Sequence, residues 1–127
     1  MLCGSFVLFL VVLLHSQLTE ATSSDNVAPE AQGPDSVSST NKDEVKLTCD
    51  MSGSPTPSVN WHRTIPGKSE RIPTDTGKFK ISAREESDGH RTTTLTIQHP
   101  SEDDYGDYTC NGFNKLGQAS HTIHLTA

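Results

Sequence analysis

The stretch that decides the fold is Asp104-Tyr105-Gly106-Asp107-Tyr108-Thr109-Cys110. It places a tyrosine two residues before a cysteine. Another cysteine, Cys49, lies far upstream, and the only tryptophan of the chain, Trp61, stands between the two. Distant cysteines with a tryptophan between them are typical of the interior of a two-sheet β-sandwich. The residues that look most reactive are therefore predicted to be scaffold.

The amino terminus has the pattern of a signal peptide. Phe6 to Leu14 is an unbroken apolar run that suits a signal-peptide core and is too short to span a bilayer, which needs about 20 residues. Small residues at Thr19 and Ala21 favour cleavage after Ala21. The alternative is a buried core helix. We predict a signal peptide over residues 1–21, a secreted extracellular protein and, since no other stretch is long and apolar enough, no membrane span.

Composition narrows the function classes further. The chain has 127 residues and a net charge of −6, which does not suit binding to a phosphate backbone, so nucleic acid is not expected. Cleavage would remove Cys3 and leave Cys49 and Cys110 in an oxidising compartment, where they are predicted to pair. Closing so long a loop is worth about 4 kcal/mol in the chain-entropy model. Two free buried thiols are the alternative.

Period-two alternation marks the strands. Val45, Leu47 and Cys49 alternate with polar residues, and Leu95 and Ile97 alternate with threonines, as in half-buried strands. Residues 22–34 are predicted to be a flexible N-terminal arm and residues 35–127 a single all-β domain. The predicted strands cover about 45–50, 58–63, 79–81, 92–98, 106–113 and 118–126, with weaker strands near 35–40 and 70–73, and loops at 52–57 and 84–90.

Together these motifs resemble the immunoglobulin superfamily, and within it the I-set. The resemblance covers about residues 35–127 and implies a Greek-key immunoglobulin-like β-sandwich with one disulfide between its sheets. The motifs that carry it are Leu47-Thr48-Cys49, Val59-Asn60-Trp61, Thr94-Leu95-Thr96-Ile97, the 104–110 stretch and the turn Asn114-Lys115-Leu116-Gly117.

The resemblance implies structural roles for the core motifs. Trp61 is expected to pack against the disulfide with Leu47 and Leu95 in the same core, and the Tyr108 hydroxyl to bond to backbone. Asp104 is expected to accept a charge-assisted bond from Lys78. Gly112 stands where an inward alanine is usual in this family, and we expect looser packing there.

The sequence offers little catalytic chemistry. His121 and His124 are three apart on a predicted strand, so they face opposite sides and cannot chelate together. The acidic run at residues 102–107 lacks the ligand spacing of a calcium loop. No nucleophile motif is present. We therefore expect no enzyme, no metal, no cofactor and no small-molecule substrate.

What remains is a surface. Strand parity turns Phe113 outward beside uncharged polar residues, as suits the centre of a protein–protein contact. The alternative is that Phe113 folds over Leu116 and seals the hairpin end. The candidate protein-binding surface comprises Asn60, His62, Thr109, Asn111, Phe113, Asn114, Lys115, Leu116, Thr122 and His124.

Three functions fit such a domain. The resemblance favours a secreted single-domain protein that recognises extracellular or cell-surface proteins, as in cell adhesion or the organisation of neuronal and synaptic surfaces. A soluble protein that sequesters a peptide hormone or masks a receptor is a second hypothesis, and a structural matrix module is a third. Binding to a second copy of itself, through this surface or an edge strand, is a further alternative.

Overall fold

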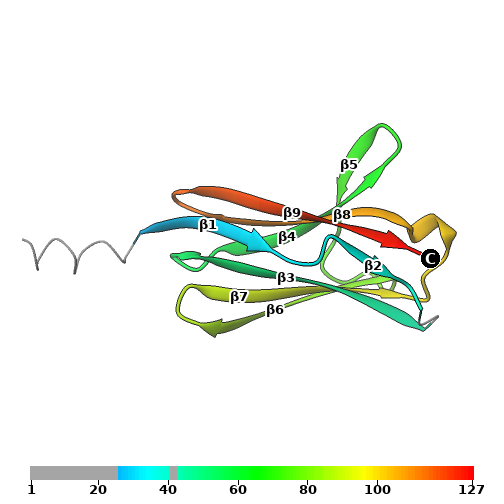
Figure 1. Ribbon diagram of the computed structural model, residues 1–127, viewed down its shortest axis with the longest axis horizontal. Coiled ribbons are helices and arrows are strands. Elements are labelled where there is room, and N and C mark those ends of the chain that lie inside the picture. Colours follow the sequence, from blue (N-terminus) through cyan, green and yellow to red (C-terminus); the bar gives the residue numbers. More distant parts are fainter. Residues whose placement is uncertain (1–25, 41–42) are drawn as a thin grey trace, which may run out of the picture.

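The computed structural model describes residues 26–40 and 43–127, so the predicted signal peptide lies outside the described residues. Two β-sheets stack face to face, and the described strands run roughly along the long axis of the molecule, apart from the hairpin that carries β5 (Figure 1). This confirms the predicted immunoglobulin-like sandwich. The sheets differ in strand number, with four in one and five in the other.

The four-stranded sheet has the order β1-β3-β7-β6 and is antiparallel throughout. Burial alternates residue by residue along β3 and β7, as the sequence period requires. Its strands are β1 (Val27–Gln32), β3 (Glu44–Ser54), β6 (Phe79–Ser87) and β7 (His90–Gln98).

The five-stranded sheet has the order β2-β9-β8-β4-β5, and β2 pairs with β9 in parallel. A 3₁₀ turn at Glu102–Asp104 makes the crossing from β7 to β8. The strands of this sheet are β2 (Ser36–Ser38), β4 (Ser58–Ile65), β5 (Lys68–Arg71), β8 (Gly106–Asn114) and β9 (Gly117–Thr126).

The predicted N-terminal arm is wrong over Val27–Gln32. These residues form β1, which pairs antiparallel with β3. The chain then changes sheets to reach β2, and the ring of His121 bonds the carbonyl of Pro34 at 2.8 Å where it crosses. The described domain therefore begins before residue 35.

Two predicted loops also prove to be strand. The charged stretch 84–90 continues β6 as far as Ser87, leaving only Asp88-Gly89 as the turn into β7. Similarly, β3 runs through Ser54 rather than ending before the predicted loop at 52–57.

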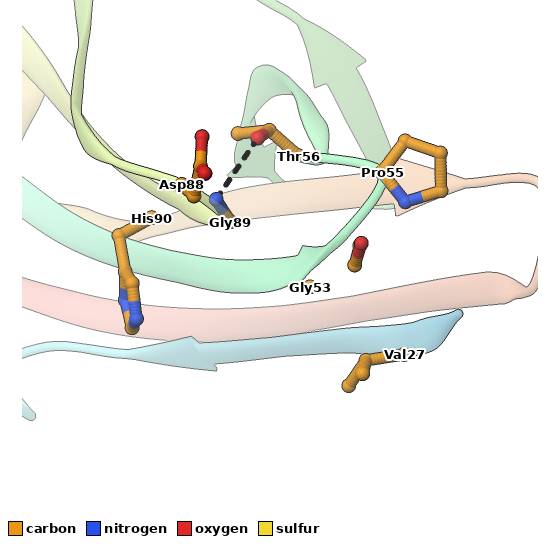
Figure 2. Close-up of a pocket in the computed structure, with 8 residues that line it drawn as sticks. Val27, Gly53, Pro55, Thr56, Asp88, Gly89 and His90 are labelled. Atoms are coloured by element: carbon orange, nitrogen blue, oxygen red, sulfur yellow. Dashed lines mark hydrogen bonds between the residues drawn. The ribbon is translucent and has the colours of Figure 1, made fainter. Parts of the chain in front are cut away.

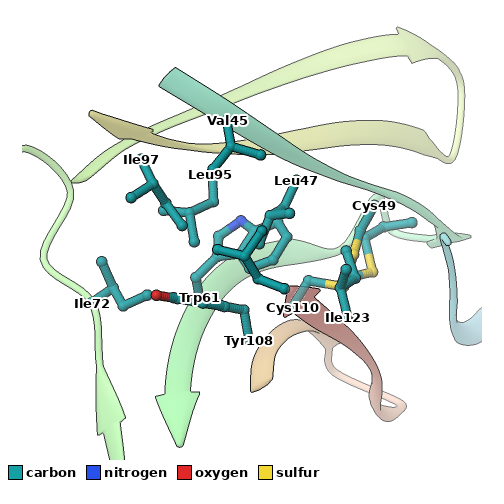
Figure 3. Close-up of a cluster of buried hydrophobic side chains, with 12 residues drawn as sticks. Val45, Leu47, Cys49, Trp61, Ile72, Leu95, Ile97, Tyr108, Cys110 and Ile123 are labelled. Carbon is teal, nitrogen blue, oxygen red and sulfur yellow. A yellow bond between two sulfur atoms is a disulfide. The ribbon is translucent and has the colours of Figure 1, made fainter. Parts of the chain in front are cut away.

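The core lies between the sheets (Figure 3). The predicted disulfide is present and joins Cys49 on β3 to Cys110 on β8. Trp61 is fully buried beside Leu47 and Leu95. Its indole N–H donates to the Thr93 hydroxyl at 2.9 Å, which adds a hydrogen bond between the sheets.

Asp104 is held as the sequence predicts. Its Oδ2 lies 2.7 Å from Lys78 Nζ and accepts the Ser101 backbone N–H at 2.8 Å. Burial alone would raise the pKa of this carboxyl, but the hydrogen bonds from Lys78 and Ser101 and the charge of Lys78 lower it below 3.8. The Asp104 carbonyl in turn accepts the Tyr108 hydroxyl at 2.6 Å. Burial raises the pKa of Tyr108 to about 12, so this hydroxyl remains a donor.

The expected loose packing at Gly112 is wrong. A Cβ at this position would lie 2.8 Å from Met51 Sδ, because the Met51 side chain fills the space that an alanine methyl would occupy. A small residue on β8 is matched by a long flexible one on β3, which keeps the interior dense.

Candidate functional site: the outer face of the five-stranded sheet

Residues opposite one another on paired strands project to the same side of a sheet. Pairing of Trp61 with Cys110 and of Tyr108 with Ile123 fixes the buried side of this sheet. The side chains one residue out of phase form its outer surface, which we call the polar face. Its members are Asn60, His62 and Thr64 of β4, Ser69 and Arg71 of β5, Asp107, Thr109, Asn111 and Phe113 of β8, and Gln118, Ser120, Thr122 and His124 of β9.

Rows of polar side chains cross this face from strand to strand. Arg71 pairs with His62, His62 with Thr109, and Thr109 with Thr122. The hydroxyls of Thr109 and Thr122 bond to each other at 2.9 Å. The next row toward the β8–β9 turn aligns Asn60, Asn111 and Ser120. The register thus brings together five of the predicted surface residues.

One charge of the polar face is already paired. His124 Nδ1 lies 2.7 Å from a carboxylate oxygen of Asp107 on the neighbouring strand. An ionised carboxylate only accepts hydrogen bonds, so the imidazole is the donor. The pair locks the outer side chains of β8 and β9 together and leaves Arg71 as the other formally charged residue of the face.

Asn60 lies on this face, and one of its side-chain atoms makes no hydrogen bond. Its side-chain oxygen is buried and has no partner among the described residues. Leaving such an acceptor without a donor costs about 1–3 kcal/mol. Among the described side chains, this is the buried polar atom that the fold itself does not satisfy.

Phe113 supplies the apolar part of the face. Its side chain is 42% exposed, and Leu116 at the hairpin tip is 45% exposed. Both residues thus keep a substantial part of their surface open to solvent at the hairpin end. Phe113 presents an exposed apolar surface where β8 reaches its end.

Asn114 does not join the polar face. Its amide nitrogen donates to the carbonyls of Val27 at 2.9 Å and Pro55 at 3.1 Å, and its amide oxygen accepts the Leu116 N–H at 2.8 Å. These bonds tie the β8–β9 turn to β1 and to the loop after β3. We therefore remove Asn114 from the candidate surface and assign it to the scaffold, while Lys115 and Leu116 stay exposed at the tip.

The outer face of the four-stranded sheet has a different chemistry. We call it the charged face, because charged side chains recur along β3 and β6 and one more stands on β1. They are Glu30, Glu44, Lys46, Asp50, Lys80 and Arg84. The two outer surfaces of one sandwich thus differ sharply in charge density.

A hollow of about 520 Å³ opens at the end of the sandwich where β1 begins (Figure 2). Its polar groups mainly bond to one another. The Thr56 hydroxyl donates to Glu85 at 2.8 Å and accepts the Gly89 N–H at 3.3 Å, and the Gly89 carbonyl accepts the Gly53 N–H at 2.9 Å. These bonds join the loop after β3 to the turn between β6 and β7, so the Thr56 hydroxyl and the Gly53 and Gly89 backbone groups are already engaged.

The part of the chain that comprises residues 26–40 and 43–127 holds no group of three or more His, Cys, Asp or Glu placed to bind a metal ion. None of its helices has the length and apolar character needed to cross a bilayer.

Sequence reasoning missed the part of the polar face that β5 contributes. Ser69 and Arg71 join it because β5 pairs with β4 in a register that sets Arg71 opposite His62. All residues of β5 are exposed, so the strand has no apolar alternation to reveal its facing. Gln118 and Ser120, by contrast, follow from the parity already used for Thr122.

The stacked sheets, the disulfide between them and the tyrosine bonded beneath them define an immunoglobulin-type domain. The model of the immunoglobulin I-set domain matches residues 31–127, and the chain belongs to this family.

Similar proteins include adhesion molecules. The chain is 37% identical to protein amalgam of Drosophila melanogaster, over 63% of this chain and 22% of that protein. It is 30% identical to neural cell adhesion molecule 1 of Gallus gallus, over 66% of this chain and 7% of that protein. The chain thus spans under a quarter of the length of these relatives.

Solved structures show the same fold. Tandem immunoglobulin domains of titin match with a TM-score of 0.61 and 29% identity, over 79% of this chain and 47% of that one. A chain from the complex of Dpr2 with DIP-Theta matches with a TM-score of 0.69 and 22% identity, over 80% of this chain and 32% of that one.

Proposed function

We propose that this I-set domain is exported and acts in extracellular protein–protein recognition, with the polar face as its binding surface. The observation that carries the proposal is the contrast between the two outer faces. One is rich in charge, and the other joins uncharged hydrogen-bonding side chains to an exposed aromatic ring. The similarity to neural cell adhesion molecule 1 supports a role in cell adhesion or surface organisation.

The chemistry of the polar face suits a protein partner. Interface centres are depleted in charged residues and enriched in aromatic ones. Phe113 is an anchor of that kind, because its burial against a partner would remove a large apolar surface from water.

Export is tested by expressing the full chain in cultured animal cells. We expect the protein in the medium with Thr22 as its first residue, as read by N-terminal sequencing. Retention inside the cell with Met1 intact would contradict the proposal.

Binding is tested by staining cells, or a panel of extracellular proteins, with the purified chain. Phe113→Ala should weaken binding at least about tenfold, as expected for an interface anchor. Lys80→Ala is the control, because Lys80 is exposed and lies on β6 in the other sheet. Equal loss from both variants, or none from Phe113→Ala, would refute this assignment. Co-purified hormone or deposition in insoluble matrix would favour the other two functions.

A further inference from the structure

We infer that the end of the sandwich where β1 begins is a docking surface for a partner segment that presents a basic side chain beside an apolar one. We call this region the end surface, and it surrounds the hollow of Figure 2. The inference goes beyond the proposed function, because it uses residues outside the polar face. The end surface consists of Val27, Pro55, Thr56, Glu85, Asp88 and Leu116.

Exposed apolar side chains gather at this end. The large hydrophobic residues that the described chain leaves exposed are Val27, Phe113 and Leu116. The Asn114 side chain holds two of them near each other, since it bonds the Val27 carbonyl at 2.9 Å and the Leu116 N–H at 2.8 Å. Contact of these groups with water is unfavourable, so an apolar group of a partner that covers them would be stabilised.

The hollow is held in shape by hydrogen bonds between its own walls. The Gly53 N–H donates to the Gly89 carbonyl at 2.9 Å, and the Asn114 amide donates to the Pro55 carbonyl at 3.1 Å. A site whose walls are already fixed loses little conformational entropy on binding. Its volume of about 520 Å³ is large enough to admit a long side chain.

Two carboxylates beside the hollow have no cationic partner among the described residues. Asp88 lines the hollow and takes no part in the hydrogen bonds and ion pairs of that part of the chain. Glu85 accepts the Thr56 hydroxyl at 2.8 Å. Arg91 lies opposite Glu85 but donates to a backbone carbonyl at 3.0 Å, and Lys115, exposed at the hairpin tip, pairs with neither carboxylate. The charge left open at this end is therefore negative.

A basic side chain suits this combination of groups. A carboxylate such as Asp88 accepts charge-assisted bonds from an ammonium or guanidinium group, and the methylene stem of lysine or arginine packs on apolar groups such as Val27 and Pro55. Arginine suits it best, because its planar fork bonds two carboxylate oxygens at once. An acidic segment would instead meet Asp88 and Glu85 with like charge.

NMR titration of the purified, isotope-labelled full chain tests the inference. The probe is a capped peptide in which one arginine stands between two leucines, and the matched probe has glutamate in place of that arginine. We expect the arginine peptide to shift the backbone amide signals of Gly53 and Gly89 in a saturable way, and the glutamate peptide to shift them less. Asp88→Asn should lower the affinity for the arginine peptide at least about threefold. This variant keeps the turn, because asparagine before glycine suits the same turn as aspartate.

Glu70→Gln is the matched control, since it removes the same charge from an exposed position on β5 in the five-stranded sheet and should leave the affinity unchanged. The inference is overturned by equal shifts from the two peptides, by equal loss in Asp88→Asn and Glu70→Gln, or by the absence of any shift. Shifts confined to amides of the polar face, such as that of Thr109, would also overturn it. These signals report on the end surface whether or not Phe113→Ala weakens cell binding, so failure of this inference and failure of the proposed function are distinguishable.

Discussion

The inner and outer sides of strand β8 differ in how deeply their side chains are buried and in how closely those side chains are matched to partners within the chain. Inward, Tyr108, Cys110 and Gly112 are buried, and each is matched to a particular partner across the interior or beneath it. On the outer side, Asn111 is only partly buried and Phe113 is exposed, so both side chains remain in contact with solvent. Substitutions on the inner side should therefore cost stability, and those on the outer side should cost binding.

The largest expected effect lies inside, at Trp61. Trp61→Ala should lower the free energy of unfolding by about 3–5 kcal/mol, since it leaves a cavity between the sheets. It also leaves the Thr93 hydroxyl without its indole donor. A urea melt with the disulfide intact measures the loss. A change below about 1 kcal/mol would mean that the interior does not depend on this residue.

The loss of folding stability at acid pH should depend on Asp104. The folded-state pKa of this carboxyl is lowered, so its contribution is present above the unfolded value of about 3.9 and is lost as the pH falls through the folded pKa. Charge-assisted hydrogen bonds of this kind are worth about 1.5–3 kcal/mol.

Lys78→Met tests the source of that contribution. It removes the ammonium 2.7 Å from Asp104 Oδ2, and we expect lower stability at neutral pH and a flatter fall below about pH 4 than in the wild type. Urea melts from pH 7 to pH 2.5 compare the two proteins. If the free energy of unfolding fell with pH in parallel for the two proteins, the Lys78–Asp104 pair would have no role in the acid response.

Particular residues show how much of this interior could be predicted from the sequence. The alternation along β3, β7 and β8 predicted the buried sides correctly, because one face of each strand packs on the core. The Asp104–Lys78 pair followed from the family resemblance. The compensation of Gly112 by Met51 did not, since no local pattern relates residues on facing sheets.

Gly112→Ala should have a smaller effect, on the order of 1 kcal/mol, because the added methyl meets Met51 Sδ. Adding Met51→Val to Gly112→Ala should recover part of the loss by restoring the space. A double-mutant cycle by thermal and urea melts measures the coupling. Strict additivity would show that Met51 does not fill the space beside Gly112.

The strands that sequence analysis missed lie at sheet edges. In β6, residues beyond Ile81 are exposed on both sides, so they show no apolar period and are fixed by pairing with β7. β1 contains a proline and lacks alternation, yet β3 provides its ladder. Asn114 looked like a surface residue because the two bonds that its amide nitrogen donates, to Val27 and Pro55, join segments far apart in the chain.

Phe113→Arg has the smallest expected effect on folding stability, and it tests the difference between the two sides of β8 most directly. Phe113→Arg should change the free energy of unfolding by no more than about 0.5 kcal/mol, since the ring is 42% exposed and an arginine stem can cover the same neighbours. Parallel urea melts of this variant and the wild type measure it. A loss of 2 kcal/mol or more would mean that Phe113 supports the end of the sandwich rather than a partner. Since the side chain points away from the Trp61 interior, a near-zero change alongside lost binding is the result that separates the two sides of β8.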